Sequence, residues 1–177
     1  VGATFEEARY EVTTYRTESY DPGSRKPEVQ YGTSLIEDLE RRDFTINAMA
    51  VRLPMVEFID PFGGIEDLAR WLIRTPASPE SSFTDDPLRM LRAARFASQL
   101  GFEVEGSTVA AMASMSERIE IVSAERVRDE LVKLVLGDHP RRGLSLLVAT
   151  GLAQRVLPEL PALALEIDEH HHHKDVY

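Results

Sequence analysis

The sequence contains no cysteine, one tryptophan and no apolar run near the roughly eighteen residues that a membrane-spanning helix requires. The missing cysteines exclude disulfides and zinc–thiolate sites. Because neither a membrane span nor a signal peptide is recognisable, we expect a cytoplasmic protein with no membrane contact. The 177 residues are 43% hydrophobic and 28% charged, which is typical of a globular protein of one or two domains.

Basic residues are scarce: 20 lysines and arginines face 30 acidic residues, and the net charge is −10. A protein that binds nucleic acid over its whole surface is normally basic, so any such contact must use a local patch. Such patches are present as arginine clusters, although clusters of this kind also occur as solvated helix faces. They are Arg41 and Arg42; Arg89, Arg92 and Arg95; Arg118, Arg126 and Arg128; and Arg141 and Arg142.

Hydrophobic periodicity divides the chain near residue 76. Before it we predict a strand (10–15), a loop (20–32), helices (34–41, 44–51 and 65–73) and a hairpin (51–53 with 56–59). After it we predict a Pro/Ser linker (76–82) and then helices only (86–100, 107–115, 123–137 and 141–150). The pattern therefore predicts an α+β fold whose second part is all helical.

The stretch 41–50 concentrates polar chemistry ahead of an apolar run. Asp43 is a good N-cap for the helix predicted over 44–51, and Asn47 projects from the same face. Together with Arg42 they place a cation, a carboxylate and an amide at one helix mouth, which suits a phosphorylated sugar. A helix capped by Asp43 and flanked by surface arginines explains the same residues equally well.

Asp86 and Arg89 are three residues apart at a predicted helix start, so their side chains can be neighbours. A carboxylate only accepts hydrogen bonds and a guanidinium only donates them. Such an edge matches the amino group and ring nitrogen of cytosine or adenine and rejects guanine and uracil, because the buried groups would stay unpaired. The simpler alternative is that Asp86 caps the helix and Arg89 is a surface charge.

Three clusters in this order resemble the bacterial class II nucleotidyltransferases, which comprise tRNA CCA-adding enzymes and their poly(A) polymerase relatives. The motif R-R-D-F-T-I-N-A matches at residues 41–48, E-D-x-x-R-M-L-R-A-x-R-F at 85–96, with Asp85 where Glu is usual, and E-R-x-x-x-E-L at 125–131. The runs E-V-T-T-Y-R at 11–16 and F-G-G-x-x-D-L at 62–68 also fit. The resemblance covers essentially the whole chain.

This resemblance implies roles for individual residues. Glu11 matches a catalytic carboxylate near the metals. The residues expected to bind nucleotide are Arg42, Asp43, Asn47, Asp85, Asp86, Arg89, Arg92 and Arg126. Those expected to bind RNA are Arg95, Arg128, Lys133, Arg141 and Arg142.

The resemblance also implies an architecture and a reaction. We expect part of a nucleotidyltransferase head with a mixed or antiparallel sheet (1–76), a helical neck (77–137), and the start of a helical body and a truncated HD-type domain (138–177). The reaction would be metal-dependent transfer of CMP and AMP from CTP and ATP to the 3′ end of tRNA. The family's D-x-D motif would lie upstream of Val1, so we expect Mg²⁺ to be held there, no metal ligand within this chain, and an inactive isolated chain.

Several alternatives stay open at this point. The motifs are shared by poly(A) polymerases and by enzymes that add only CC or only A, and a fragment without D-x-D fits a catalytically silent nucleotide- or RNA-binding protein. The histidine run 170–173 is either a tag remnant or the opening of the HD-type domain. The sequence leaves the oligomeric state undetermined.

Overall fold

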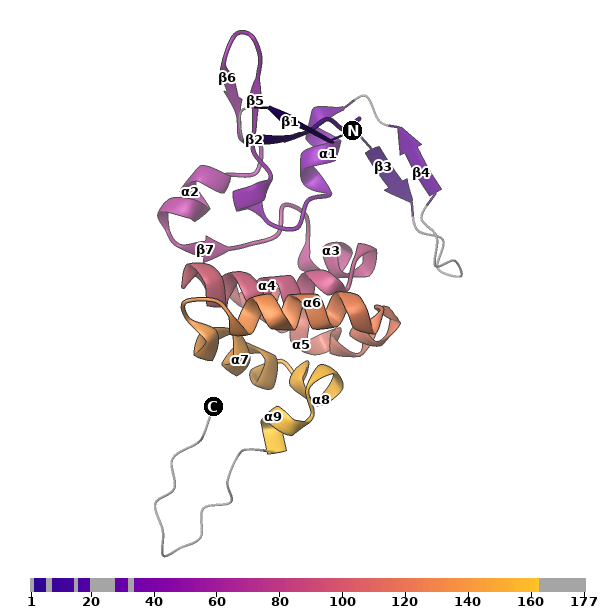
Figure 1. Ribbon diagram of the computed structural model, residues 1–177, viewed down its shortest axis with the longest axis vertical. Helices are drawn as coiled ribbons and strands as arrows, with labels where there is room; N and C mark the ends of the chain where they lie inside the picture. Colours follow the sequence, from indigo (N-terminus) through magenta and orange to yellow (C-terminus); the bar gives the residue numbers. More distant parts are fainter. Residues whose placement is uncertain (1, 6–7, 15, 20–27, 32–33, 163–177) are drawn as a thin grey trace, which may run out of the picture.

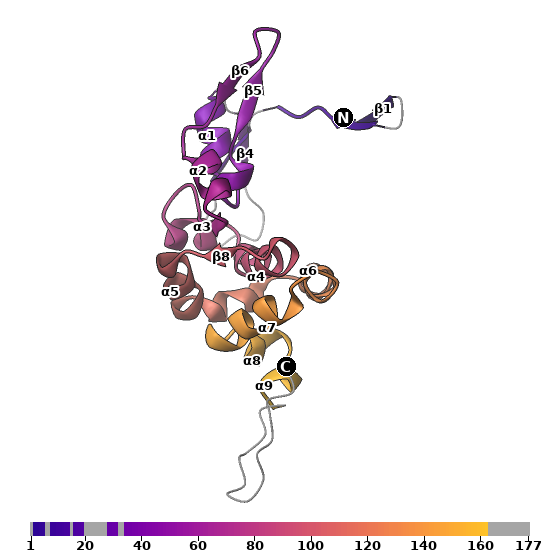
Figure 2. The ribbon, with the colours of Figure 1, turned by 90° about the vertical axis from the view of Figure 1, so that its left-hand side faces the viewer.

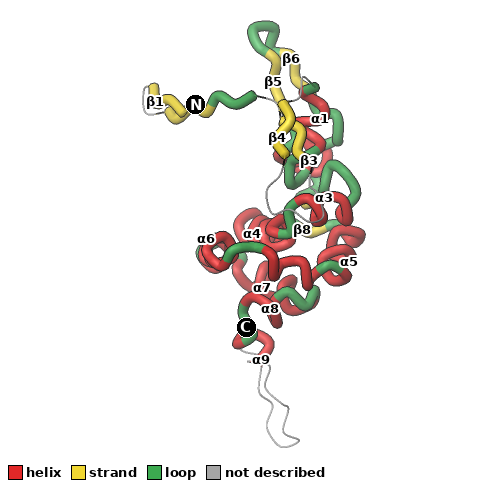
Figure 3. The backbone as a smooth tube through the Cα atoms, turned by 90° about the vertical axis from the view of Figure 1, so that its right-hand side faces the viewer, coloured by secondary structure: helices red, strands yellow, loops and turns green. Residues whose placement is uncertain are grey.

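A computed structural model of the chain describes residues 2–5, 8–14, 16–19, 28–31 and 34–162. The histidine run and most of the predicted loop at 20–32 lie outside these residues. The strand-rich part occupies one end of the molecule and the helical part the other (Figures 1 and 3). This arrangement confirms the α+β fold predicted from the sequence.

Within the residues that the structure describes, the strands form four two-stranded sheets. Three are antiparallel hairpins: β1 (Gly2–Phe5) with β2 (Ala8–Glu11), β3 (Arg16–Ser19) with β4 (Glu28–Tyr31), and β5 (Ala50–Arg52) with β6 (Glu57–Ile59). The last confirms the predicted hairpin. The strand predicted over 10–15 instead begins at residue 8 and ends at residue 11, and part of the predicted loop forms β4.

The fourth sheet joins the two parts of the chain. In it β7 (Leu72–Ile73) pairs in parallel with β8 (Glu103–Val104). The helix predicted over 65–73 was therefore too long, because α2 spans Gly64–Ala69 and the last two residues of that range form β7. The helical spacing predicts one apolar face made of Ile65, Leu68, Ala69 and Leu72, but Ile65 and Leu68 are exposed and Leu72 belongs to β7, so local periodicity misled the prediction.

The helix predicted over 44–51 is also wrong. Only Thr45–Asn47 are helical, as a single 3-10 turn called η1, which follows α1 (Leu35–Glu40). Phe44 adopts an extended backbone, with φ −137° and ψ 154°, and is fully buried. Its ring meets Phe96 edge-on at 5.6 Å between centroids, so this tertiary contact replaces the first helical turn.

The predicted linker at 76–82 is partly helical, because α3 spans Pro79–Asp85. Ser78 caps it by accepting a hydrogen bond from the Ser81 N–H, and Pro79 occupies the first helical position. Next come α4 (Leu88–Leu100), α5 (Gly106–Ser114) and the 3-10 helix η2 (Ser116–Ile121). They are followed by α6 (Ala124–Val135), α7 (Pro140–Ala149), α8 (Ala153–Val156) and α9 (Glu159–Ala162).

The helical part is organised around α4, which packs against both α6 and α7. Met90, Leu91 and Ala94 of α4 are at most 1% exposed. Gly143 allows α7 to approach, because a Cβ at that position would lie 2.7 Å from the carbonyl oxygen of Ala94. The domain boundary predicted after residue 137 thus runs through a shared core, and the domain division stays a prediction.

Candidate nucleotide-binding site

A pocket of about 390 Å³ opens where the end of α1, η1 and the start of α4 meet. Four arginines and two aspartates line it, so it is locally positive in a chain of net charge −10. Such a site attracts anionic ligands and favours groups that carry phosphate. The lining residues are Arg41, Arg42, Asp43, Asn47, Asp86, Arg89 and Arg92.

Asp43 connects η1 to α4 instead of capping a helix. One carboxylate oxygen, Oδ1, accepts hydrogen bonds from the Phe44 N–H at 2.8 Å and from Asn47 Nδ2 at 3.1 Å. The other, Oδ2, lies 2.6 Å from Nη2 of Arg92 in an ion pair. Asp43 is 6% exposed, and within the described residues Oδ2 has no well-aligned hydrogen-bond donor. These contacts hold the Asp43 carboxylate in one orientation at the wall of the pocket.

Arg42 and Asn47 lie beside this carboxylate, as the sequence predicted. Nη1 of Arg42 donates to the Asn47 carbonyl oxygen at 3.2 Å, which ties the two residues together. About half of the Arg42 side chain remains exposed, at 49%. Its guanidinium is thus held at the pocket and still accessible to a phosphate.

Asp86 makes a capping contact at the start of α4 and also lines the pocket, and its role in base reading stays a prediction. Its Oδ1 accepts from the Leu88 N–H at 3.1 Å, as a capping residue does, and the side chain also lines the pocket. Its Oδ2 pairs with Nη2 of Arg126 at 3.0 Å, which brings the start of α6 to the pocket. Arg89 lines the same pocket, whereas Asp85 is half-buried just behind it and is not a lining residue.

Arg95, expected to bind RNA, lies largely inside the helical part. Its side chain is 12% exposed and its Nε is 3.2 Å from Oε2 of buried Glu130. Burial lowers the pKa of the Arg95 guanidinium, and the nearby Glu130 carboxylate opposes that effect. Its guanidinium carbon also stacks 4.2 Å from the centre of the Phe96 ring. Because these contacts lie inside the protein, Arg95 is not part of the RNA-binding surface that we propose below.

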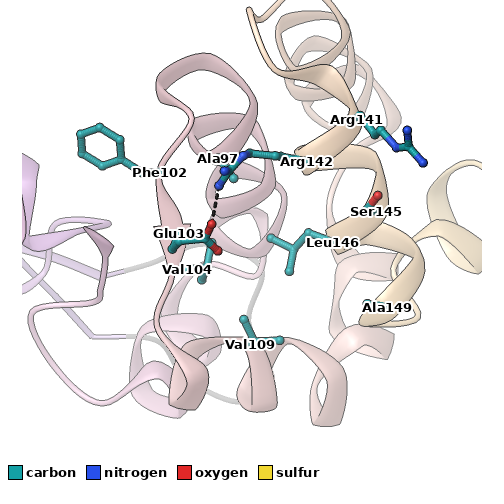
Figure 4. A pocket seen from close by; sticks show the side chains of 10 residues that line it. All are labelled: Ala97, Phe102, Glu103, Val104, Val109, Arg141, Arg142, Ser145, Leu146 and Ala149. Atoms are coloured by element: carbon teal, nitrogen blue, oxygen red, sulfur yellow. Dashed lines mark hydrogen bonds and ion pairs between the residues drawn. The ribbon is translucent and has the colours of Figure 1, made fainter. Parts of the chain in front are cut away.

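The other candidate RNA-binding residues are exposed on two helices. Arg128 and Lys133 lie on α6, and Lys133 is 3.9 Å from Glu130. Arg141 and Arg142 on α7 line a second pocket of about 510 Å³ with a largely apolar floor. In this pocket Arg142 reaches toward Glu103 and pairs with it, whereas Arg141 projects away (Figure 4).

Glu11 is not brought to the candidate nucleotide pocket. It ends β2, its side chain is 69% exposed, and its carboxylate lies 3.7 Å from the guanidinium of Arg9. The β1–β2 hairpin projects sideways from the rest of the molecule (Figure 2). The catalytic role of Glu11 stays a prediction.

Sequence reasoning missed two residues at the pocket. Arg41 lines it, although we had assigned no role to the first arginine of the motif. Ser82 contacts Arg89, but it fell inside the predicted linker, and no local pattern distinguishes it. For Arg41, its position next to Arg42 in the motif was a signal that could have identified it. For Ser82 the sequence offered none.

This chain is similar to known protein families and to individual enzymes. Residues 1–74 match the family model described as the poly A polymerase head domain, and residues 101–163 match the one described as the probable RNA- and SrmB-binding site of polymerase A. The CCA-adding enzyme of Limosilactobacillus reuteri is 47% identical over 146 residues, which are 82% of this chain and 36% of that protein. The Bacillus velezensis enzyme is also 47% identical, over 90% of this chain and 39% of that protein.

Solved structures agree with these sequence matches. The CCA-adding enzyme of Bacillus stearothermophilus in complex with CTP superposes with a TM-score of 0.76 at 36% identity, over 93% of this chain and 43% of that one. The Thermotoga maritima enzyme complexed with tRNA gives 0.65 at 35% identity, over 71% and 31%. The chain belongs to the class II nucleotidyltransferase family of bacterial tRNA CCA-adding enzymes and poly(A) polymerases.

The chain spans well under half the length of these relatives. None of the helices within the described ranges has the length and hydropathy needed to cross a membrane.

Proposed function

We propose that the protein containing this chain is a tRNA CCA nucleotidyltransferase. The observation that carries the proposal is the single pocket that joins Arg42, Asp43 and Asn47 from the strand-rich part to Asp86 and Arg89 at the start of α4. These positions come from two motifs that are about forty residues apart in the sequence. The relatives that the chain matches at 47% identity are CCA-adding enzymes, and a structure similar to this chain is of a CCA-adding enzyme in complex with CTP.

In this proposal the two sides of the pocket bind different parts of the nucleotide. The Asp43 carboxylate, which lines the pocket, accepts from a ribose hydroxyl, and Arg42 with its neighbouring arginines holds the phosphates. Asp86 and Arg89 bind the base edge and select C and A by the donor–acceptor order. Arg126, which pairs with Asp86, fixes the direction of that carboxylate.

The proposed reaction transfers CMP or AMP to the 3′ end of tRNA. The terminal hydroxyl oxygen forms a bond to the α-phosphorus of CTP or ATP, and the bond from that phosphorus to the pyrophosphate breaks. The family implies a divalent metal, for which we propose Mg²⁺. The described residues hold no group of three or more acidic, histidine or cysteine side chains that fits a metal ion. In this proposal the residues that line the pocket bind and orient the nucleotide.

For the tRNA we propose the exposed basic side chains of α6 and α7: Arg128, Lys133 and Arg141, with Arg142 contributing when it leaves Glu103. They follow from a family match over 101–163 that is described as RNA-binding. We propose the cytoplasm as the location, because tRNA, CTP and ATP meet there.

The test is nucleotide addition by the longest natural form of the protein. The substrate is a tRNA that ends just before CCA, incubated with Mg²⁺ and labelled ATP, with and without CTP. We expect one labelled A per tRNA, and only when CTP is present. A ladder of A without CTP would instead establish a poly(A) polymerase, and no incorporation under either condition would leave a binding protein.

A further inference from the structure

The guanidinium of Arg89 is held by acceptors on two other segments of the chain. Its Nη1 donates to Oγ of Ser82 at 2.8 Å and lies 3.4 Å from the Ser82 carbonyl oxygen. Its Nη2 donates to the carbonyl oxygen of Arg41, at the end of α1. A side chain that is otherwise long and flexible therefore has a defined orientation at the pocket.

Ser82 is well placed to be such an anchor. It lies in α3 and is 3% exposed, so its hydroxyl is shielded from competing water. Its carbonyl oxygen also accepts the backbone N–H of Asp86 at 3.1 Å. One residue thus contacts both members of the pair that we propose reads the base, using its side chain for Arg89 and its backbone for Asp86.

The donor count of Arg89 agrees with a role in positioning. A guanidinium carries five N–H hydrogens, and three acceptors from Ser82 and Arg41 engage at most three of them. Within the part of the chain that the structure describes, at least two hydrogens of this pocket-lining guanidinium have no acceptor from Ser82 or Arg41. Without the Ser82 hydroxyl, Nη1 would keep only the 3.4 Å contact, and the guanidinium would turn more freely.

We propose that Ser82 is a positioning residue that sets base selectivity by fixing the guanidinium of Arg89. This inference rests on the proposed function and deepens it. A fixed Arg89 presents its donors at one place, where cytosine or adenine offers a ring nitrogen and uracil or guanine offers an N–H. A mobile Arg89 can shift and donate to a carbonyl oxygen of uracil or guanine, so that the enzyme binds the wrong base.

The test compares Ser82→Ala with the unaltered long form, by measuring kcat/KM for each of CTP, ATP, UTP and GTP. Alanine is a good helix former and leaves the backbone anchor of Asp86 in place, so we expect a folded enzyme. We expect the ratio of kcat/KM for CTP over UTP to fall about tenfold, the effect of losing one hydrogen bond to a charged group. The ratio for ATP over GTP should fall in the same direction.

Two variants serve as controls. Ser81→Ala removes the neighbouring exposed hydroxyl of the same helix but keeps the backbone N–H that donates to Ser78, so its ratio should match the unaltered enzyme. Ser82→Thr restores a hydroxyl and should recover most of the selectivity. Thermal unfolding of each variant separates a folding defect from a change in selectivity, and if Ser82→Thr is unfolded the two alanine variants still decide.

An unchanged CTP/UTP ratio in Ser82→Ala would overturn the inference. So would equal losses of kcat/KM for all four nucleotides, because a purely structural role lowers them together. Failure of the proposed function looks different: the unaltered protein itself would then incorporate no C, whether or not it added A.

Discussion

The helical and strand-rich regions differ in how far several of their large apolar side chains are exposed to solvent. In the helical region (76–162), residues such as Leu91, Leu134 and Leu147 are at most 1% exposed around α4. In the strand-rich region, Leu53, Met55 and Trp71 are 75%, 72% and 62% exposed. Most of the buried apolar core among the described residues comes from the helical region, and Phe44 and Ile73 of the strand-rich region join that same core.

A buried polar network supplies part of what packing does not. Oδ2 of Asp67, a residue 3% exposed, accepts from the Thr45 hydroxyl at 2.5 Å and pairs with Arg74 at 2.8 Å. Arg74 also donates to the Phe62 carbonyl oxygen at 2.9 Å. This network fixes η1 against α2 and so holds the Asp43 wall of the pocket. The pocket therefore joins a region stabilised by packing to one stabilised by directed polar contacts.

The largest effect should come from a cavity in the helical core. Leu91→Ala should lower the free energy of unfolding by about 3 kcal/mol, because the side chain is 1% exposed and its loss leaves a void. Leu53→Ala, at a side chain 75% exposed, should change it by less than about 0.5 kcal/mol. Urea unfolding measures both, and equal losses would contradict the contrast between the regions.

The next effect tests the polar network. Asp67→Ala leaves the Thr45 hydroxyl and the partly exposed Arg74 without this partner, and should cost about 2 kcal/mol. Glu66→Ala is the matched control, because Glu66 pairs with Arg70 at 3.2 Å on the exposed side of the same helix. That change should cost at most about 0.5 kcal/mol. If both variants unfold at the same urea concentration, the network does not stabilise this region.

A third variant separates ligand binding from stability at the pocket. Asp43→Ala should raise KM for CTP about tenfold, because a buried acceptor for the ribose is lost. Steady-state kinetics of the long form, together with thermal unfolding, make the measurement. A lower unfolding temperature with unchanged KM would assign Asp43 to holding Asn47 and Arg92 only.

The smallest effect concerns the RNA surface. Arg128→Ala and Lys133→Ala should each reduce the slope of log K against log salt by about one for tRNA binding. Arg52→Ala removes a charge that is already paired with Glu57 on the strand-rich side, and should leave the slope unchanged. Titrations at several salt concentrations test this, and equal slopes for all variants would remove α6 from the RNA surface.

Several elements were predictable because their determinants are local. Ser34 caps α1 by accepting from the Glu37 N–H, Ser123 caps α6 by accepting from the Arg126 N–H, and Gly101 ends α4 at φ 68°. The helix over 141–150 appears as α7, one residue displaced. Apolar periodicity was less reliable: Val135, predicted to face the core on α6, is 53% exposed.

The sequence by itself determined the family, the longer helices of the helical region, and the motifs that supply the pocket, because caps, turns and residue spacing act over a few positions. Only the tertiary structure decided that Phe44 is extended, that β7 pairs with β8, and that Asp86 meets Arg126 forty positions away. It likewise decided that Ser82 and Arg41 hold Arg89. These contacts join segments that become neighbours only after the helices pack, so no local pattern carries them.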